Sequence, residues 1–315
     1  MSDFSIFEYG LGIFQALLII VLSPLIVGIM RKIKAKSQKR IGSGIFQLYY
    51  DIIKLLKKDE VVSDQSSWLF RYTPWINFVS IASAAFFIPV FLVYSPFGVV
   101  GDILFVVGLF ALGRFFTMLA GLDVASSFGG LGSSREMMVS ALLEPVLFMT
   151  IFVIALFYGG TNISTIVTSA NDTSILIVPG VLFAMIAFFI IMMAETGKIP
   201  FDNPSTHLEL TMIHESMVLE YSGKNLALME WSHAIKQMIL FALFVDIFFT
   251  WNFVEQISLV GISIGILFFI AKVSALASFT AFIETRVAKW RLFRVSDLIA
   301  MAISSSMIGV IFFFL

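Results

Sequence analysis

The sequence predicts an all-α integral membrane protein with about eight transmembrane helices and one cytoplasmic amphipathic helix. The chain has 315 residues, of which 59% are hydrophobic and 13% are charged, whereas soluble domains average roughly 25% charged residues. Apolar runs of about 20 residues, the length that crosses a bilayer as a helix, recur along the whole chain. Basic residues occur in alternate connections between these runs, as expected for a multi-pass protein.

We expect a single polytopic membrane domain over 1–315 with eight apolar segments as its spans. Pro89 and Pro145 lie within two of these segments, where a packed bundle tolerates a kinked helix. The first segment lacks the basic region and the cleavage site of a signal peptide, so we interpret it as a retained span. The predicted spans are 9–30, 74–95, 102–121, 137–158, 176–195, 236–254, 257–283 and 296–314.

Lysine and arginine residues predict the orientation. Basic residues are abundant between the first two spans and recur in the later connections on that side. Segments 1–8, 96–101, 159–175 and 255–256 contain none. Cytoplasmic connections are enriched in these residues, so we expect both termini on the outer side. The connection between the first two spans contains Arg31, Lys32, Lys34, Lys36, Lys39, Arg40, Lys54, Lys57, Lys58 and Arg71.

Segment 41–58 predicts an amphipathic helix that is too charged to be a span. We interpret it as a helix that lies along the cytoplasmic membrane surface or under a partner subunit. A simple lipid anchor is the alternative interpretation. The predicted apolar face comprises Ile45, Leu48, Ile52, Ile53, Leu55 and Leu56, and the charged face comprises Asp51, Lys54, Lys57 and Lys58.

A polar stretch follows the fifth predicted span, and we expect 196–235 to form a cytoplasmic loop with one short helix. Pro200 and Pro204 predict a turn, because proline fixes φ and lacks a backbone N–H. A helix from about 205 to 221 would follow this turn. Ionisable groups collected beside membrane spans point to function rather than to folding. The stretch contains Glu195, Asp202, Glu209, Glu215 and Glu220 together with His207 and His214.

Four charged residues lie well inside predicted spans, away from the ends: Arg114, Glu144, Asp246 and Lys272. Each costs about 2.5–3.5 kcal/mol at the centre of an isolated membrane helix, so their side chains must face the bundle, a partner or water. We expect Arg114 to pair with Glu144, and Asp246 to pair with Lys272. Two interpretations remain open: the pairs only hold helices together, or they form titratable sites of an ion path.

Two motifs that resemble known sites can be set aside. His214-Glu215 begins like the zinc-protease pattern HExxH, but Val218 stands at its last position, so we expect no metal site. The glycines within 128–132 lack the strand-to-helix setting of a nucleotide-binding loop. We expect them to form a flexible cytoplasmic loop, with Ser133 or Ser134 capping the next helix. The chain contains no cysteine, which excludes iron–sulfur clusters or a nickel–iron centre held by its own thiolates.

Three sequence blocks, in order over nearly the whole chain, resemble the membrane subunit 1 family of respiratory complex I. The family patterns are RxGPxGxxQ…D…KL, an arginine nine residues before a membrane glutamate, and PFD…EL…EYSG. One block alone would be a weak match, but three in register are specific. The blocks are RIGSGIFQ at 40–47 with Asp51 and Lys54-Leu55 after it, Arg135 before Glu144, and PFD, EL and EYSG at 200–202, 209–210 and 220–223.

The third block is most similar to the membrane subunit of energy-converting NiFe-hydrogenases, of the Ech and formate hydrogenlyase subunit 4 types. Ser205, Thr206 and His207 stand where the quinone-reducing enzymes have several glutamates. In the first block, Ser43 replaces the proline of the family, which changes the expected shape of that loop.

The resemblance implies a membrane anchor that links a soluble hydrogenase module to H⁺ or Na⁺ movement across a prokaryotic cell membrane. The implied partners are the hydrogenase large and small subunits, an iron–sulfur subunit and antiporter-like membrane subunits. The nickel–iron centre and the clusters would lie in these partners, and this chain would carry no cofactor and no catalytic residue. The expected ion path comprises Glu144, Glu195, Glu209, Glu215, Glu220, Asp246, Lys272 and Arg114. The expected docking residues are Arg40, Gln47, Asp51, Lys54, Arg135, Asp202, His207 and His214.

Two other functions remain open. The chain could be the quinone-site subunit of an NADH–quinone oxidoreductase, which a quinone cavity would favour. A stand-alone ion transporter, from another class, would work without a redox partner and would often show inverted repeats. We find no convincing repeat, and the many basic residues after the first span suit a docking surface better.

Overall fold

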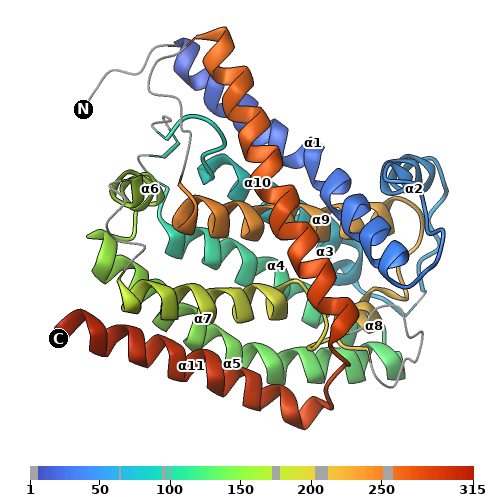
Figure 1. Ribbon diagram of the computed structural model, residues 1–315. Helices are drawn as coiled ribbons and strands as arrows, with labels where there is room; N and C mark the ends of the chain where they lie inside the picture. Colours follow the sequence, from blue (N-terminus) through green and yellow to red (C-terminus); the bar gives the residue numbers. More distant parts are fainter. Residues whose placement is uncertain are drawn as a thin grey trace.

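The computed structural model describes residues 6–63, 65–93, 97–98, 101–171, 178–202, 212–250 and 258–315. The described chain is helical, with no strand beyond an isolated bridge between Asp102 and Asn162. The predicted all-α fold is therefore confirmed (Figure 1). The elements are α1 Ile6–Ser37, α2 Gln47–Leu56, α3 Trp68–Ala84, the 3₁₀ helix η1 Ala85–Phe87, α4 Ile103–Asp123, α5 Ser127–Tyr158, α6 Ile163–Asn171, α7 Pro179–Glu195, α8 His214–Val218, α9 Gly223–Phe248, α10 Leu259–Arg286 and α11 Leu292–Phe314.

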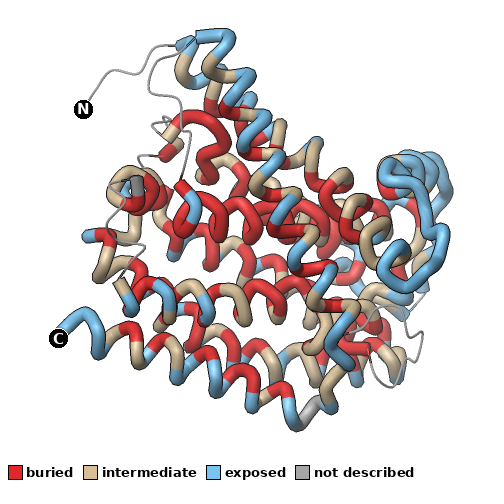
Figure 2. Tube along the Cα trace, in the orientation of Figure 1, coloured by how far each residue is buried: buried red, intermediate tan, exposed pale blue. Residues whose placement is uncertain are grey.

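Helix α9 occupies the centre of the bundle and is buried along almost its whole length (Figure 2). It packs against α1 and α3, whereas α5, α7 and α11 pack together in another part of the bundle. Helix α10 crosses beside α1 at the periphery (Figure 1). The apolar side chains of the peripheral helices remain exposed, among them Leu259 and Leu267 of α10. An apolar exposed surface of this kind fits a hydrocarbon environment.

Six described helices are long and apolar enough to cross a membrane: α1, α4, α5, α9, α10 and α11. The other two predicted spans correspond to α3 and α7, each of which has 17 residues. Figure 1 shows α2 and α8 at one end of the bundle, opposite the end of α11. This placement agrees with a topology in which the polar elements lie on the side opposite the carboxyl terminus.

The second predicted span, 74–95, is wrong at both ends, since α3 begins at Trp68 and ends at Ala84. The chain after η1 is not helical because its backbone donors have another acceptor. The side-chain Oε1 of Gln15, on α1, accepts hydrogen bonds from the backbone N–H groups of Val90, Phe91 and Leu92 at 2.8–3.1 Å. A buried glutamine thus satisfies the non-helical backbone of this segment.

The predicted glycine loop at 128–132 is also wrong, because helix α5 already begins at Ser127. Ser126 caps it, with its Oγ accepting from the N–H of Gly129 at 3.2 Å. The glycines permit close packing: a Cβ at Gly129 would lie 2.5 Å from the carbonyl oxygen of Gly121 on α4. A Cβ at Gly132 would lie 2.0 Å from Ser216 Oγ on α8. Glycine here marks helix contacts rather than flexibility.

The polar segment after α7 is shorter than the predicted 196–235, because α9 begins at Gly223. The predicted helix at 205–221 is also wrong in extent, since residues 212 and 213 are not helical and α8 is only His214–Val218. The Oδ2 atom of Asp202 accepts from the N–H groups of Ile213 and His214 at 3.0 and 3.3 Å, which fixes the start of α8.

The amphipathic helix α2 is shorter than the predicted 41–58. Leu48 and Ile52 are buried and pack against Val27 of α1 and Ala234 of α9. Ile53 and Leu56 of the predicted apolar face remain exposed. The helix therefore uses one part of its apolar face for the bundle and leaves another part for lipid or a partner, in agreement with an interfacial position.

Candidate functional site

Arg114, near the middle of α4, lies at the centre of a charged cluster inside the bundle. Its guanidinium contacts Glu195 directly, lies 3.3 Å from Glu144 Oε1 and lies 3.7 Å from Glu136 Oε1. Its Nη1 also donates to Ser140 Oγ at 3.1 Å. The predicted pair between Arg114 and Glu144 is thus present, as one contact of a larger network.

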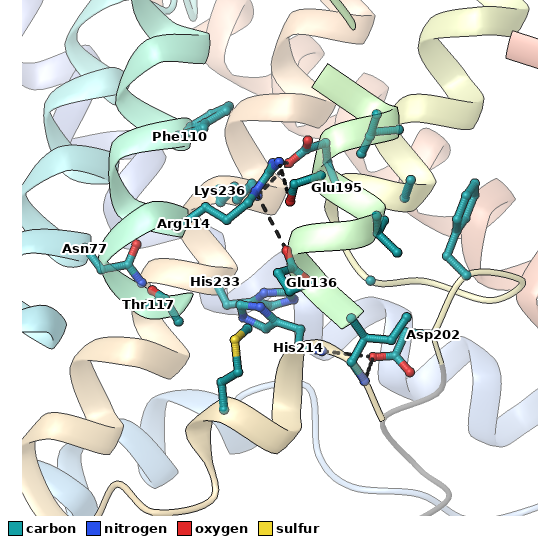
Figure 3. Close-up of a pocket in the computed structure, with 18 of the residues that line it drawn as sticks. Asn77, Phe110, Arg114, Thr117, Glu136, Glu195, Asp202, His214, His233 and Lys236 are labelled. Carbon is teal, nitrogen blue, oxygen red and sulfur yellow. Dashed lines mark hydrogen bonds and ion pairs between the residues drawn. The ribbon is translucent and has the colours of Figure 1, made fainter. Parts of the chain in front are cut away.

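Lys236 of α9 supplies a second cation to this cluster. Its Nζ lies 2.7 Å from Glu195 Oε2, and the Glu195 side chain is only 2% exposed. Glu195 is the last residue of α7, and its carboxylate forms ion pairs with Arg114 of α4 and Lys236 of α9. The cluster, defined as Arg114, Glu136, Glu144, Glu195 and Lys236, joins four helices and is called the Arg114 cluster below. Figure 3 labels all of its members except Glu144.

The Arg114 cluster contains two cations and three carboxylates. With every group ionised it would carry one surplus negative charge, which is costly where the groups are buried, as Arg114 and Glu195 are. One additional proton would neutralise it. In addition, Glu195 Oε1 is buried and accepts no hydrogen bond from the described residues. A network balanced in this way can take up or release a proton when a neighbouring charge changes.

Sequence reasoning missed Glu136 and Lys236 as site residues. Glu136 lies eight residues before Glu144, about two helical turns, and therefore on nearly the same face of α5. The predicted span begins at 137 and so excludes Glu136, although this spacing is a usable signal. The sequence places Lys236 at the edge of a predicted span, whereas it lies more than three turns inside α9.

Two of the three histidines lie beside the Arg114 cluster. The rings of His214, at the start of α8, and His233, on α9, have centroids 5.3 Å apart and planes tilted by 31°. The sequence predicts that His214 docks a partner, but its ring faces the interior. Burial lowers the pKa of His214, and the negative charge of Glu136 opposes this shift. His233 is not among the predicted site residues, although it lies three residues before Lys236 on one helix face.

Two cavities meet near these histidines. A small cavity of about 50 Å³ is lined by every member of the Arg114 cluster except Glu144, and also by Asn77 and His233 (Figure 3). A larger cavity of about 620 Å³ lies between the last turns of α1, the start of α2, the segment after α7 and α9. Its wall carries both basic groups, such as Arg31 and Lys34, and the acids Glu215 and Glu230.

Two titratable groups of the larger cavity have shifted pKa values. Burial raises the pKa of Glu215 to about 7, and repulsion from Glu230 and Asp202 adds to this shift. Burial, with the nearby charge of Lys34, lowers the pKa of Lys198 to about 8. Glu215, predicted for the ion path, therefore changes charge near neutral pH, as a residue that exchanges protons must.

Two predicted docking residues instead hold the polar segment in place. Asp202 Oδ1 accepts from Lys289 Nζ at 2.9 Å, while its Oδ2 caps α8. Arg135 Nη1 donates to the carbonyl of Met212 at 2.9 Å. Asp202 is only 3% exposed. In the single chain the Asp202 carboxylate is thus engaged within the fold, and its docking role stays a prediction.

The residues predicted for docking around α2 are accessible. Arg40, Gln47 and Lys54 are exposed, and Gln47 Nε2 donates to Asp51 Oδ1 at 2.9 Å. Arg40 also lines the larger cavity. Glu220 is exposed next to this region, and Glu209 and His207 lie outside the described residues.

The predicted pair between Asp246 and Lys272 is an electrostatic interaction without a hydrogen bond. Both carboxylate oxygens of Asp246 are buried and accept no hydrogen bond from the described residues. Lys272 Nζ donates to the backbone carbonyl of Phe249 at 3.1 Å. Both residues lie away from the Arg114 cluster along α9 and α10, so the structure brings together only part of the predicted ion path.

Comparison with known proteins shows which family this chain resembles. A family profile described as NADH dehydrogenase matches residues 10–314. Hydrogenase-4 component C of Escherichia coli strain K12 is 36% identical over 280 residues, which cover 88% of this chain and 87% of that protein. Formate hydrogenlyase subunit 4 of the same strain is 34% identical over 278 residues, covering 88% of this chain and 90% of that protein.

A solved structure has the same fold. A chain of the membrane-bound sulfane sulfur reductase, an archaeal respiratory membrane complex, superposes with a TM-score of 0.79, at 21% identity. The match covers 95% of this chain and 98% of that chain. The chain described here therefore belongs to the NADH dehydrogenase subunit 1 family of membrane proteins.

Proposed function

We propose that this chain is the membrane anchor and ion-translocation coupling subunit of a membrane-bound NiFe-hydrogenase complex of the formate hydrogenlyase or Ech type. The observation that carries the proposal is the Arg114 cluster, five charged groups from four helices inside a bundle whose relatives are hydrogenase subunits. Such groups are costly in a membrane, and their presence there supports a role in ion movement.

The partners in this proposal are the hydrogenase large and small subunits, an iron–sulfur subunit and antiporter-like membrane subunits. Redox chemistry would take place in those partners, since this chain contains no cysteine that could hold an iron–sulfur cluster or a nickel–iron centre. The exposed surface around α2, with Arg40 and Lys54, would form part of the docking surface. The chain itself would supply coupling rather than catalysis.

Electrostatics is large enough for the coupling. A unit charge that appears 4 Å from another group is worth about 4 kcal/mol at an effective dielectric constant of about 20. That energy corresponds to a pKa change of about three units. A charge that appears this close to a member of the Arg114 cluster can therefore alter the protonation of the cluster, and no large conformational change is needed.

A quinone-site subunit is the less favoured function. The NADH-ubiquinone oxidoreductase chain 1 of Neurospora crassa is 30% identical over 215 residues, which cover only 64% of this chain. The two hydrogenase relatives have higher identity and cover 88% of this chain. The sequence of residues 206–223 differs from the corresponding sequence of the quinone-reducing enzymes. It therefore also favours the hydrogenase branch of the family.

Affinity purification of the tagged chain from its native membrane tests the anchor role. We expect polypeptides with nickel and iron–sulfur clusters to copurify in fixed proportion. A stand-alone transporter would instead purify by itself and move an ion or solute in vesicles without a metalloprotein. That result would refute the proposal.

Substitution of Glu144 by Gln in the intact complex tests the coupling role. Its carboxylate lies 3.3 Å from Arg114 Nη1, so the neutral amide removes one titratable site and leaves the shape of the side chain. We expect hydrogen evolution with a markedly lower ratio of ions moved to hydrogen formed. Wild-type ion movement in this variant would exclude Glu144 from the path.

A further inference from the structure

The two cavities share one wall, and that wall contains the histidine pair. The larger cavity, of about 620 Å³, is lined by charged groups of the polar side of the bundle. The smaller cavity, of about 50 Å³, is lined by four members of the Arg114 cluster: Arg114, Glu136, Glu195 and Lys236. Anything that passes from one to the other must cross the residues that line both. These shared residues are Gly197, Asp202, His214, Met229 and His233.

Only the two histidines of this wall are suited to pass a proton. Gly197 and Met229 have no titratable group. Asp202 is already engaged with Lys289 through one oxygen and with two backbone N–H groups at the start of α8 through the other. A neutral imidazole, by contrast, has one nitrogen that donates and one that accepts, so it can take up a proton on one side and release a proton on the other.

The positions of the rings fit a transfer between the cavities. His214 comes from α8 and His233 from α9, and their centroids lie 5.3 Å apart, a separation that one water molecule can bridge. Glu136 is the acid whose charge acts most strongly on His214. Glu136 in turn lies 3.7 Å from Arg114 Nε. Figure 3 shows the two rings next to Glu136, on the side of the cluster that faces Asp202.

We propose that His214 and His233 form a two-imidazole relay that carries protons between the larger cavity and Glu136 of the Arg114 cluster. The relay rests on the proposed function, because it supplies the cluster with the protons that coupled ion movement requires. In each step an imidazole accepts one proton on its free nitrogen and releases one from the other nitrogen. No net charge remains on the pair after a proton has passed.

The relay gives the histidines a role that docking does not. Both side chains are only partly exposed, and the exposed part faces the cavities. The charged groups that face His214 come from four other parts of the fold: Glu136 on α5, Arg114 on α4, Lys236 on α9 and Asp202 before α8. The charges of these four groups act on the pKa of His214 from both sides of the wall.

Chemical rescue tests the relay in the intact complex. His233→Ala and His214→Ala would be assembled in inverted membrane vesicles, with hydrogen evolution driven by a chemically reduced viologen. Proton uptake would be followed with a pH-sensitive dye. Loss of a proton-transfer group typically costs a factor of about 10² to 10⁴, so we expect uptake per hydrogen formed to fall at least tenfold. We expect added imidazole, which fits the larger cavity, to restore it.

The series of rescue agents separates a relay from a structural effect. Methylimidazoles of similar size but different pKa should restore uptake to different degrees, in the order of their proton affinity. His233→Gln should lose uptake without being rescued, because the amide occupies the site. The matched control is Met229→Leu, a volume-conserving change on the same wall, which should keep wild-type uptake.

Each outcome has a definite meaning. Wild-type proton uptake in the His214→Ala, His233→Ala double variant overturns the relay, as does a loss that no imidazole rescues while the complex stays assembled. If Glu144→Gln loses uptake but the double histidine variant does not, only the relay fails. If the wild-type complex moves no ions during hydrogen evolution, the proposed function fails and the relay fails with it.

Discussion

Arg114 holds three carboxylates from two other helices at one point inside the bundle. Substitution by Gln would leave Glu136 and Glu144 without their cation and Glu195 with Lys236 alone. Removal of one partner of a buried ion pair costs about 3–5 kcal/mol, so we expect Arg114→Gln to lower the free energy of unfolding by an amount of this order. Thermal unfolding of the purified complex measures the change.

The control for this prediction is Arg71→Gln, since Arg71 is exposed at the start of α3. A surface substitution of this kind changes stability by about 0.5 kcal/mol or less. Equal melting temperatures for the two variants would mean that the ion pairs of the cluster contribute little to the fold.

Glu215 predicts a pH dependence. Its pKa is about 7 in the folded chain and 4.5 in an ordinary environment. Between these values the unfolded chain has lost the proton that the folded chain keeps. Folded-state stability therefore falls as pH rises from about 4.5 to about 7 and is level above that. We expect Glu215→Gln to remove this fall.

Infrared spectroscopy of the purified chain follows the same group directly. The carboxylic acid band of the wild type should disappear as pH rises through about 7, and the Glu215→Gln variant should lack that titration. Glu220→Gln, at an exposed site, is the control and should keep it. An unchanged titration in Glu215→Gln would assign the proton to another group.

The sequence predicts the pair between Arg114 and Glu144, because two opposite charges inside neighbouring spans have few other partners. It does not predict Lys236 or His233 as members of the site. The predicted helix begins at 236, whereas α9 begins at Gly223. The start of α9 depends on the left-handed backbone of Gly223, with φ of +53°, and on contacts with a distant segment near Asp59, which local patterns do not contain.

At the scale of elements, α1 and the segment before α2 approach so closely that only glycine fits at position 28. A Cβ at Gly28 would lie 1.8 Å from the carbonyl oxygen of Ile45. We therefore expect Gly28→Ala to displace the segment and to weaken the Tyr49 hydroxyl bond to the Val21 carbonyl. Overpacking of this kind costs about 1–3 kcal/mol. Faster trypsin cleavage after Arg40 would report the displacement.

Gly10 gives a matched control on the same helix, because nothing lies within 4 Å of a Cβ built there. Alanine is a better helix former than glycine by about 0.5–1 kcal/mol, so Gly10→Ala should leave cleavage unchanged or slower. If both variants were cleaved like the wild type, the segment would have room that the structure does not show.

Glycine is also where prediction from sequence fails at this scale. Gly129 and Gly132 look like a loop because glycine is common in loops. In the structure they lie in α5 and let it approach Gly121 and Ser216. The same residue type serves both purposes, and only the tertiary contact distinguishes them. Helix α3 ends early for a similar reason, because the donors that follow it find Gln15 on another helix.

For the molecule as a whole, apolar run lengths predict the helices well, and each of the eight predicted spans corresponds to a described helix. The length of an apolar run is a good predictor because the thickness of the bilayer determines how long a spanning helix must be. The side of each connection is a separate prediction, drawn from lysine and arginine.

Cysteine labelling tests that orientation cleanly, since the chain has no cysteine of its own. A membrane-impermeant maleimide added to intact cells should label Leu315→Cys at the exposed carboxyl terminus. It should not label Lys57→Cys, just after α2, until the cells are opened. Labelling in the opposite order would invert the topology and place the larger cavity on the outer side.

Substitution of Glu195 in the intact complex tests the central claim that the Arg114 cluster couples electron flow to ion movement. Ions moved per hydrogen formed would be measured in vesicles for the wild type, Glu195→Gln and the control Arg71→Gln, at an exposed position outside the cluster. We predict continued hydrogen evolution in all three, with at least a tenfold lower ratio in Glu195→Gln alone. A wild-type ratio in Glu195→Gln would contradict the account.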